Sequence, residues 1–221
     1  MIAVAIDGPV GAGKSSLARI CAKKLGYIYV DTGALYRTVG LFCARNSIDT
    51  DNHTAVKLAI SSKLKLEIRL IDGTQHVYMN GEDVSEDIRT PEMSMMASKV
   101  SAIGEVRHYL VDIQRKMAEE NNVIMDGRDI GTVILPNAQV KIFITAKPEI
   151  RAKRRYDELV AKGMDVKFED VLSDLNKRDY NDSHRAEAPL KQADDAVLLD
   201  TSELDFDGSA NAIIKIIEEK I

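Results

Sequence analysis

The stretch from Ile2 to Ser16 constrains the fold of this chain more than any other part of it. An apolar run ends at Asp7, a glycine-rich turn follows, and a helix-forming segment begins at Lys14. The turn has the spacing G-x-x-x-x-G-K-[ST], which indicates a phosphate-binding loop when a strand precedes it and a helix follows it. Because both flanking patterns are present, we expect the loop to bind a nucleoside triphosphate. The alternative is a flexible turn with a solvated lysine.

Each residue type in this loop has a physical task. Glycine lets the backbone pass close to an anion, and the loop N–H groups and the following helix N-terminus then face the phosphates. Lys14 adds a full positive charge at the outer phosphates, and the hydroxyl of Ser15 is placed to bind Mg²⁺. Ser16 offers a second hydroxyl, so the spacing leaves open which serine approaches the metal. The predicted nucleotide-binding residues are Gly8, Pro9, Val10, Gly11, Ala12, Gly13, Lys14, Ser15 and Ser16.

Composition and charge exclude several function classes. A net charge of −5 gives no general basic surface, so we expect no nucleic-acid partner. No signal peptide or long apolar run is present, so we expect a cytoplasmic protein with no membrane contact. Cys21 and Cys43 are isolated and are expected in the core. No large exposed apolar stripe indicates a dimer, so we expect a monomer.

Strand and helix patterns alternate along most of the 221 residues. This order predicts an α/β fold of the P-loop NTPase type, with a five-stranded, mostly parallel sheet covered by helices on both faces. The expected strands are residues 2–6, 27–30, 123–125, 140–145 and 196–199. The main expected helices are residues 14–25, 34–45, 51–62, 103–120, 148–161, 168–180 and 206–220.

A change of period interrupts this alternation. Residues 64–70 alternate between apolar and polar, Asp72-Gly73 marks a turn, and residues 75–79 return as a second strand. Asn80-Gly81 marks another turn before a possible short strand. These signals predict a β-hairpin or meander within an inserted subdomain of about residues 38–105.

Polar residues gather where the predicted strands end. Ligands of open α/β sheets bind at the carboxyl ends of the strands. Beside the loop, these positions hold Asp31-Thr32-Gly33 with Arg37, and the run 126–129. Arg178, Asp182 and Arg185 follow a predicted helix. Because guanidinium groups suit phosphate oxygens, the arginines favour a second, phosphate-bearing substrate.

These motifs together resemble those of the bacterial cytidylate kinases, a family of P-loop nucleoside monophosphate kinases. The resemblance runs almost end to end, including the β insertion. One departure is Ser15, where many nucleoside monophosphate kinases have glycine before the hydroxyl residue. The motifs are Gly8-Pro-Val-Gly-Ala-Gly-Lys-Ser-Ser, Asp31-Thr-Gly-Ala-Leu-Tyr-Arg, Gly81-Glu-Asp-Val-Ser, Ile88-Arg-Thr, Asp126-Gly-Arg-Asp-Ile-Gly-Thr, and Arg178 to Arg185 followed by Ala188-Pro189-Leu190.

The resemblance implies a single P-loop kinase domain over residues 1–221 that transfers the γ-phosphoryl group of ATP, with Mg²⁺, to CMP or dCMP. It implies that the insertion binds the monophosphate and that a helical lid spans about residues 148–165. The implied acceptor-phosphate contacts are Arg37, Arg128 and Arg185, the cytosine contacts are Thr32, Arg107 and Asp129, and the sugar contacts are Ser98, Arg178 and Asp182. The implied catalytic side chains are Lys14, Arg128, Arg151, Arg155 and Arg185.

The implied cytosine contacts make chemical sense. Cytosine presents an N4 amine donor beside acceptors, so Asp129 can accept from the amine and Arg107 can donate to the acceptors. Uracil would place an oxygen against the carboxylate, which leaves a buried polar group unpaired. In the lid, Arg151 and Arg155 lie one helical turn apart and are favoured over Arg154 for contacts to the triphosphate. The alternative for each is a solvated basic face.

Two other functions compete with this one. A P-loop kinase of another small molecule, such as shikimate, also uses arginines but needs neither the β insertion nor a base-reading aspartate. A non-enzymatic nucleotide switch that binds GTP usually carries Asn-Lys-x-Asp after a strand. Residues 176–179 have those letters, but they fall within a predicted helix, which argues against a switch.

Overall fold

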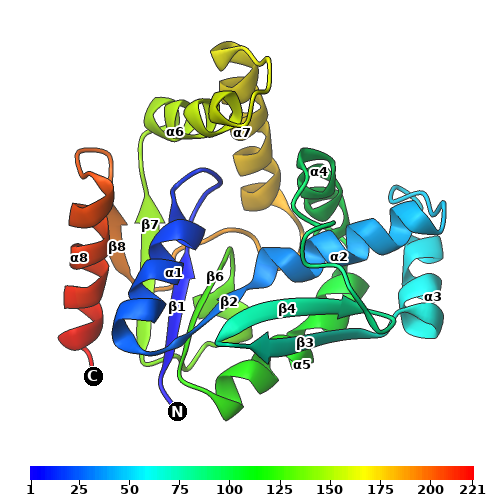
Figure 1. Cartoon of the computed structure of the whole chain (residues 1–221), viewed down its shortest axis with the longest axis horizontal. Helices are drawn as coiled ribbons and strands as arrows, with labels where there is room; N and C mark the ends of the chain where they lie inside the picture. Colours follow the sequence, from blue (N-terminus) through cyan, green and yellow to red (C-terminus); the bar gives the residue numbers. More distant parts are fainter. The chain divides into compact units, whose positions relative to one another are not determined.

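A computed structural model describes all 221 residues, which form two compact units. One unit comprises residues 28–123 together with Met1, and the other comprises residues 2–27 and 124–221. Figure 1 shows the chain coloured along the sequence and labelled by element. The boundaries proposed for the inserted subdomain and the lid remain predictions.

The five-stranded sheet confirms the predicted fold class. The strand order is β2-β6-β1-β7-β8, and β7 pairs in parallel with both β1 and β8. All five residues of β1 are buried, as its continuous apolar run requires. The bounds are β1 (Ala3–Asp7), β2 (Ile28–Asp31), β6 (Val123–Gly127), β7 (Val140–Thr145) and β8 (Val197–Asp200).

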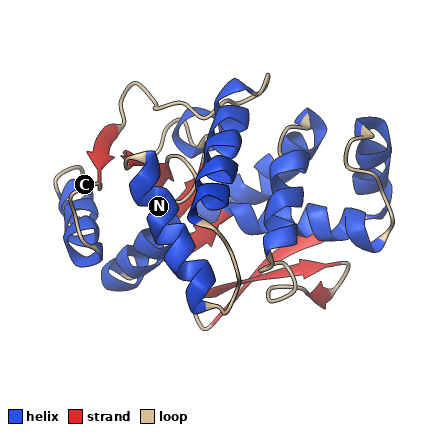
Figure 2. Cartoon of the chain, turned by 90° about the horizontal axis from the view of Figure 1, so that it is seen from above, coloured by secondary structure: helices blue, strands red, loops and turns tan.

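Figure 2 shows the helices of the chain in blue and its strands in red. In the unit of residues 2–27 and 124–221, helices α1 and α8 contact strands β1 and β7 respectively. Helix α1 packs on α8, and α6 packs on α7. Gly26 ends α1 with a φ of 70° and donates its N–H to Ala22, as its position after the helix predicted. The helices are α1 (Lys14–Leu25), α6 (Pro148–Ala161), α7 (Phe168–His184), α8 (Phe206–Glu218) and a one-turn π-helix, η1 (Ile130–Ile134).

Helix α7 is longer than the sequence pattern indicated. It continues to His184 and not only to about residue 180, so Asp182 lies on the helix, as Arg178 does, and does not follow it. The apolar stripe stops at Leu175, and the last turns are polar because they face other polar side chains. The run 176–179 lies inside α7, which confirms the argument against a guanine-binding motif.

The unit of residues 28–123 is built around one apolar cluster, whose many fully buried residues include Phe42 and Leu35. Helix α2 packs closely on α4, because Gly40 has no side chain: a Cβ there would lie 2.8 Å from the Cβ of Met96. Asn52 caps α3, because its side-chain oxygen accepts the N–H of Ala55 at 3.0 Å. The helices are α2 (Thr32–Arg45), α3 (His53–Lys63), α4 (Pro91–Val100) and α5 (Gly104–Glu120).

The predicted hairpin and meander are confirmed as a three-stranded antiparallel sheet of β3 (Leu66–Ile71), β4 (Thr74–Met79) and β5 (Glu82–Asp83). Both turns contain two residues with positive φ, at 51° and 73° in Asp72-Gly73 and at 52° and 89° in Asn80-Gly81. Asp-Gly and Asn-Gly suit such turns because they tolerate left-handed backbone.

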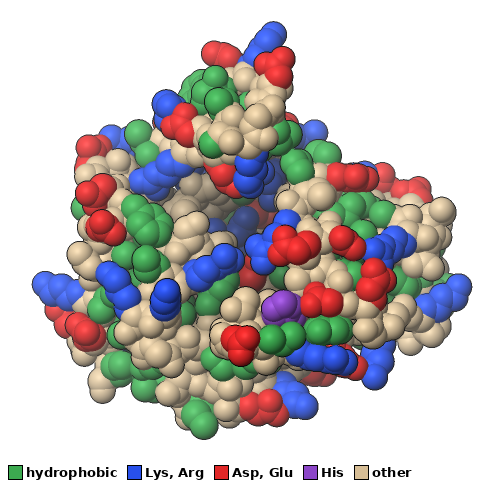
Figure 3. All heavy atoms as spheres, viewed as in Figure 1, with side chains coloured by type: hydrophobic (Ala, Val, Ile, Leu, Met, Phe, Trp, Pro, Cys, Tyr) green, Lys and Arg blue, Asp and Glu red, His purple; other side chains and the backbone are tan.

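The surface mixes both signs of charge. Figure 3 shows Lys and Arg side chains interspersed with Asp and Glu over the face that it draws. None of the helices combines the length and the apolar character that crossing a membrane requires. Cys21 and Cys43 are both buried, which confirms their predicted place in the core.

Candidate active site

The glycine-rich loop closes tightly after β1. Gly8 has a φ of 147°, and a Cβ there would collide with the carbonyl oxygen of Ile144. Gly13 has a φ of 80°, a left-handed conformation that glycine adopts readily. The Lys14 side chain is buried and its Nζ donates to the carbonyl oxygen of Pro9 at 2.7 Å. The loop therefore curls around its own lysine, as a phosphate-binding loop must.

Buried Lys14 and the partly buried Arg128 and Arg178 lie close together beside the loop. Burial lowers the pKa of Lys14, and the nearby charge of Arg128 lowers that pKa further. Burial and then Arg128 likewise lower the pKa of Arg178. The Nε atom of Arg178 is buried and has no hydrogen-bond partner. A bound anion would relieve this repulsion and would give that donor an acceptor.

The hydroxyl of Ser15 binds a carboxylate to which the sequence analysis assigned no role. This hydroxyl donates to Oδ2 of Asp126 at 2.8 Å, and Asp126 is the residue of β6 just before Gly127. Hard oxygen ligands of this kind suit Mg²⁺, which keeps several waters and takes few protein ligands. The donor set therefore fits Mg²⁺ at Ser15, and no such carboxylate contact is recorded for Ser16.

Asp7, at the end of β1, anchors the segment after β6. Its two carboxylate oxygens accept the backbone N–H groups of Ile130 and Gly131, each at 2.8 Å. These contacts fix the start of η1, directly after Asp129. Burial raises the pKa of Asp7 from 3.8 to about 6, although the two N–H groups act in the opposite direction. The carboxylate that holds this segment is thus close to its own titration near neutral pH.

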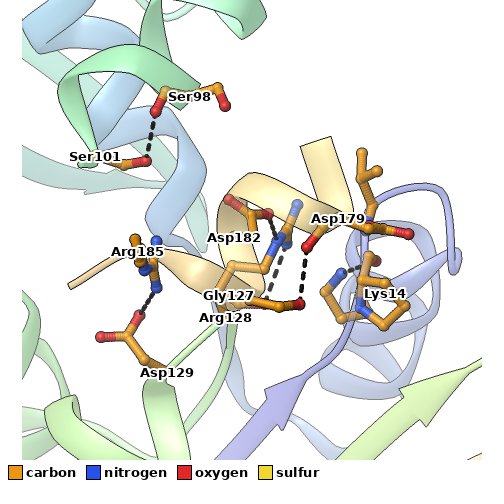
Figure 4. A network of polar contacts seen from close by, with 12 residues as sticks. Lys14, Ser98, Ser101, Gly127, Arg128, Asp129, Asp179, Asp182 and Arg185 are labelled. Atoms are coloured by element: carbon orange, nitrogen blue, oxygen red, sulfur yellow. Dashed lines mark hydrogen bonds and ion pairs between the residues drawn. The ribbon is translucent and has the colours of Figure 1, made fainter. Parts of the chain in front are cut away.

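Two ion pairs join α7 and the chain after it to the segment after β6 (Figure 4). Arg128 Nε donates to Oδ2 of Asp182 at 2.8 Å, and Arg185 approaches Oδ1 of Asp129 at 3.4 Å. Burial raises the pKa of Asp182, but Arg128 outweighs it and leaves that pKa below its ordinary value. Four residues that the resemblance assigned to the acceptor nucleotide therefore lie together.

The two arginines singled out on α6 have different surroundings. Arg151 is buried and donates to the carbonyl oxygens of Ala146 and Val10, each at 2.8 Å. It also pairs with Asp179 of α7 at 2.5 Å. Arg155 is partly exposed and pairs with Glu158 at 2.8 Å. Arg151 is therefore bound to the glycine-rich loop, while the hydrogen-bonded partner of Arg155 lies on its own helix.

The other predicted contacts lie in the unit of residues 28–123. Asp31 caps α2 through the N–H of Ala34 and pairs with Arg37 at 2.8 Å. Arg107 is buried, lies over the ring of Tyr36 and donates to a backbone oxygen of Ser101. The hydroxyl of Ser101 in turn donates to the carbonyl oxygen of Ser98. Thr32 is buried at the start of α2.

A glutamine of the hairpin supports this group. The side chain of Gln75 accepts from the N–H of Asp31 at 2.9 Å and donates to its carbonyl oxygen at 3.2 Å. The hairpin thereby holds the backbone from which Asp31 reaches Arg37. Sequence reasoning missed Gln75, since no local motif connects residue 75 with residue 31. The unassigned aspartates Asp7 and Asp126 did carry a signal, because each ends a predicted strand.

Comparisons with known proteins bear on the whole chain. A family model described as Cytidylate kinase matches residues 4–219. A cytidylate kinase of Caldicellulosiruptor bescii is 48% identical over 97% of this chain and 95% of that protein. One of Lactobacillus johnsonii is 48% identical over 100% of this chain and 95% of that protein. An uncharacterized protein from Eubacterium ventriosum, with a TM-score of 0.54 and 16% identity over 99% of both chains, shares the fold.

The raised pKa of Asp7 predicts a pH dependence of stability. Because the folded state holds this proton more tightly than the unfolded state, the stabilisation is complete below pH 3.8 and is lost as the pH rises through about 6. We expect the free energy of unfolding of the wild type, relative to Asp7→Asn, to fall by about 1 kcal/mol between about pH 5 and about pH 7.5. Urea unfolding of both proteins without nucleotide, at several pH values, measures this difference in the free energy of unfolding.

Asp165→Asn, in an exposed loop, serves as the control and should leave the pH dependence of the wild type unchanged. A difference between wild type and Asp7→Asn that stays constant over this pH range would contradict the prediction.

Proposed function

The chain belongs to the cytidylate kinase family, and we propose that it transfers the γ-phosphoryl group of ATP to CMP or dCMP, giving ADP and CDP or dCDP. The observation that carries the proposal is the group of cations beside the glycine-rich loop. Arg128 repels both Lys14 and Arg178, and the buried Nε of Arg178 has no hydrogen-bond partner. Phosphate oxygens are the anions that such a group, next to such a loop, would bind.

We propose catalysis by positioning and charge neutralisation. The acceptor phosphate is already anionic, so the reaction needs no strong base to create a nucleophile. Lys14 and the loop N–H groups would bind the donor phosphates, while Arg37, Arg128 and Arg185 would hold the acceptor phosphate in line. Exclusion of water by a lid over about residues 148–165 would suppress hydrolysis of ATP. Arg151 and Arg155 are the proposed lid arginines.

We propose that Ser15 and Asp126 hold the Mg²⁺ that accompanies ATP. Their contact at 2.8 Å brings two hard oxygen ligands together beside the loop. The bound metal would supply further positive charge to the donor phosphates. Ser16 remains the alternative hydroxyl, since it follows Ser15 directly in the first turn of α1.

For nucleotide recognition, we propose Thr32, Arg107 and Asp129 as contacts of cytosine. Asp129 is 4% exposed and lies 3.4 Å from Arg185, so a uracil oxygen beside it would place a second acceptor against a buried carboxylate. Ser98, Arg178 and Asp182 are the proposed contacts of the sugar. The proposed partners are these small nucleotides alone, bound by a cytoplasmic monomer without nucleic acid or membrane.

A substrate panel tests the proposed activity. We expect CMP and dCMP to produce ADP from ATP far faster than UMP or AMP, measured with purified protein and a coupled assay of ADP. Lys14→Ala is expected to lower kcat by at least about a hundredfold, since it removes a charge that stabilises the transferred group. Circular dichroism would establish that this variant is folded. Slow hydrolysis that no monophosphate accelerates would indicate a switch protein instead.

Asp129 provides a test of base recognition. Asp129→Asn is expected to lower the ratio of kcat/KM for CMP to that for UMP by about tenfold or more, because its amide can donate to the uracil oxygen that the carboxylate repels. Glu119→Gln, an exposed position of α5, is the control. An unchanged ratio in Asp129→Asn would remove this residue from base recognition.

The proposed metal ligands predict a difference between the two serines. We expect Ser15→Ala to raise the Mg²⁺ concentration needed for half-maximal activity by about tenfold, the effect of losing one ligand to a charged centre. Ser16→Ala should raise it less, because no contact to Asp126 is lost. Titration of activity with Mg²⁺ at saturating ATP measures both. The reverse order of the two variants would assign the metal to Ser16.

A further inference from the structure

The backbone of Val10, inside the glycine-rich loop, is held on both sides by charged side chains. Its N–H donates to Oδ1 of Asp179 at 3.1 Å, and its carbonyl oxygen accepts from Nη1 of Arg151 at 2.8 Å. The same Nη1 donates to Oδ2 of Asp179. Val10, Arg151 and Asp179 thus form a closed ring of three hydrogen bonds. We call these three residues the Val10 clamp.

The clamp joins the loop to two helices. Arg151 belongs to α6 and Asp179 to α7, and both contact the loop from outside. The neighbouring Gly11 lies so close to them that a Cβ would stand 3.1 Å from Cδ1 of Leu175 and 3.3 Å from Cβ of Arg151. The loop therefore has no freedom to widen on this side without breaking the clamp.

Charge alone does not explain why a carboxylate, that of Asp179, lies beside this loop. A carboxylate beside a loop that binds a triphosphate repels the ligand, and Asp179 accepts an N–H of that loop. The Arg151 side chain is only 6% exposed, so its guanidinium needs an anionic partner, and Asp179 supplies one. The negative charge of Asp179 thus disfavours binding of the triphosphate, but its hydrogen bonds offset this by holding the loop in one conformation.

From this geometry, and resting on the proposed kinase function, we propose that Asp179 is a positioning residue for donor binding: through Arg151 and the Val10 backbone it sets the loop in the conformation that accepts the ATP phosphates. Its neighbours on α7, Arg178 and Asp182, face the buried cation group. The helix proposed to contact the acceptor sugar therefore also shapes the donor loop, so we expect binding of ATP and of CMP to depend on each other.

Substitutions of Asp179 distinguish positioning from simple charge by the sign of the effect. If the carboxylate acts only through its charge, Asp179→Ala and Asp179→Asn remove the same charge and should both tighten ATP binding. If it positions the loop, Asp179→Ala should raise KM for ATP by about tenfold, the effect of losing a hydrogen bond to a charged group. KM for ATP in Asp179→Asn should lie between those of the wild type and Asp179→Ala, because the amide oxygen of asparagine can still accept the N–H of Val10.

The experiment measures KM for ATP and for CMP, and kcat, for the wild type, both variants and the control Asp174→Asn, at an exposed position of α7. Calorimetry of ADP binding with and without CMP gives the dependence of one ligand on the other. We expect KM for ATP to rise by a larger factor than kcat falls. KM for ATP should be highest in Asp179→Ala, intermediate in Asp179→Asn and lowest in the wild type. CMP should change the affinity for ADP less in Asp179→Ala than in the wild type.

An unchanged or lower KM for ATP in Asp179→Ala, or equal values in the two variants, would overturn the positioning role. A wild type without CMP-dependent ADP formation would instead overturn the proposed function, since that measurement does not involve Asp179. If Asp179→Ala does not fold, as judged by circular dichroism, Asp179→Asn and calorimetry of ADP binding decide the question in the same way.

Discussion

Buried positive charge beside the glycine-rich loop is the condition on which the rest of the site depends. Burial and the nearby charge of Arg128 lower the pKa of Lys14, so two cations held this close together destabilise the folded site. The surrounding carboxylates limit this effect. Asp182 pairs directly with Arg128, while Asp126 and Asp7 contribute attraction at Lys14. The pairing is incomplete, because the buried Nε of Arg178 has no hydrogen-bond partner.

The carboxylates around these cations also hold backbone segments in place through hydrogen bonds. Asp7 ends β1 and binds the N–H groups at the start of η1, so one side chain sets both the approach to the loop and the segment that carries Arg128 and Asp129. The Val10 clamp has a similar double role on the opposite side of the loop. Local geometry and charge compensation are thus provided by the same residues, and a substitution at one of them disturbs both.

The sequence predicted those features that depend on local patterns. The glycine-rich turn between β1 and α1, the alternation that produces the five-stranded sheet, and the Asp72-Gly73 hairpin all follow from residues near one another in the chain, and the structure confirms their backbone form. Helix α7 was predicted too short because its last turns lack an apolar stripe. The π-helical turn at Ile130 was not predicted, since it depends on Asp7, more than a hundred residues away.

Contacts between distant segments explain the missed site residues as well. Gln75 binds the backbone of Asp31 and belongs to no motif. Asp179 binds the backbone of Val10 and lies in the run Arg178 to Arg185, but that run assigned it no role. The roles proposed for Thr32, Ser98 and Arg107 come from resemblance and stay predictions.

The glutamine of the hairpin has a further consequence, which concerns solubility. Strand β2 lies at the edge of the five-stranded sheet, where unpaired N–H and C=O groups invite a strand from another molecule. Gln75 satisfies both backbone groups of Asp31 with its own amide, as a neighbouring strand would do. The two backbone groups of Asp31 are therefore already occupied by a side chain of β4, which lies beside β2, and are not available to a strand of another molecule.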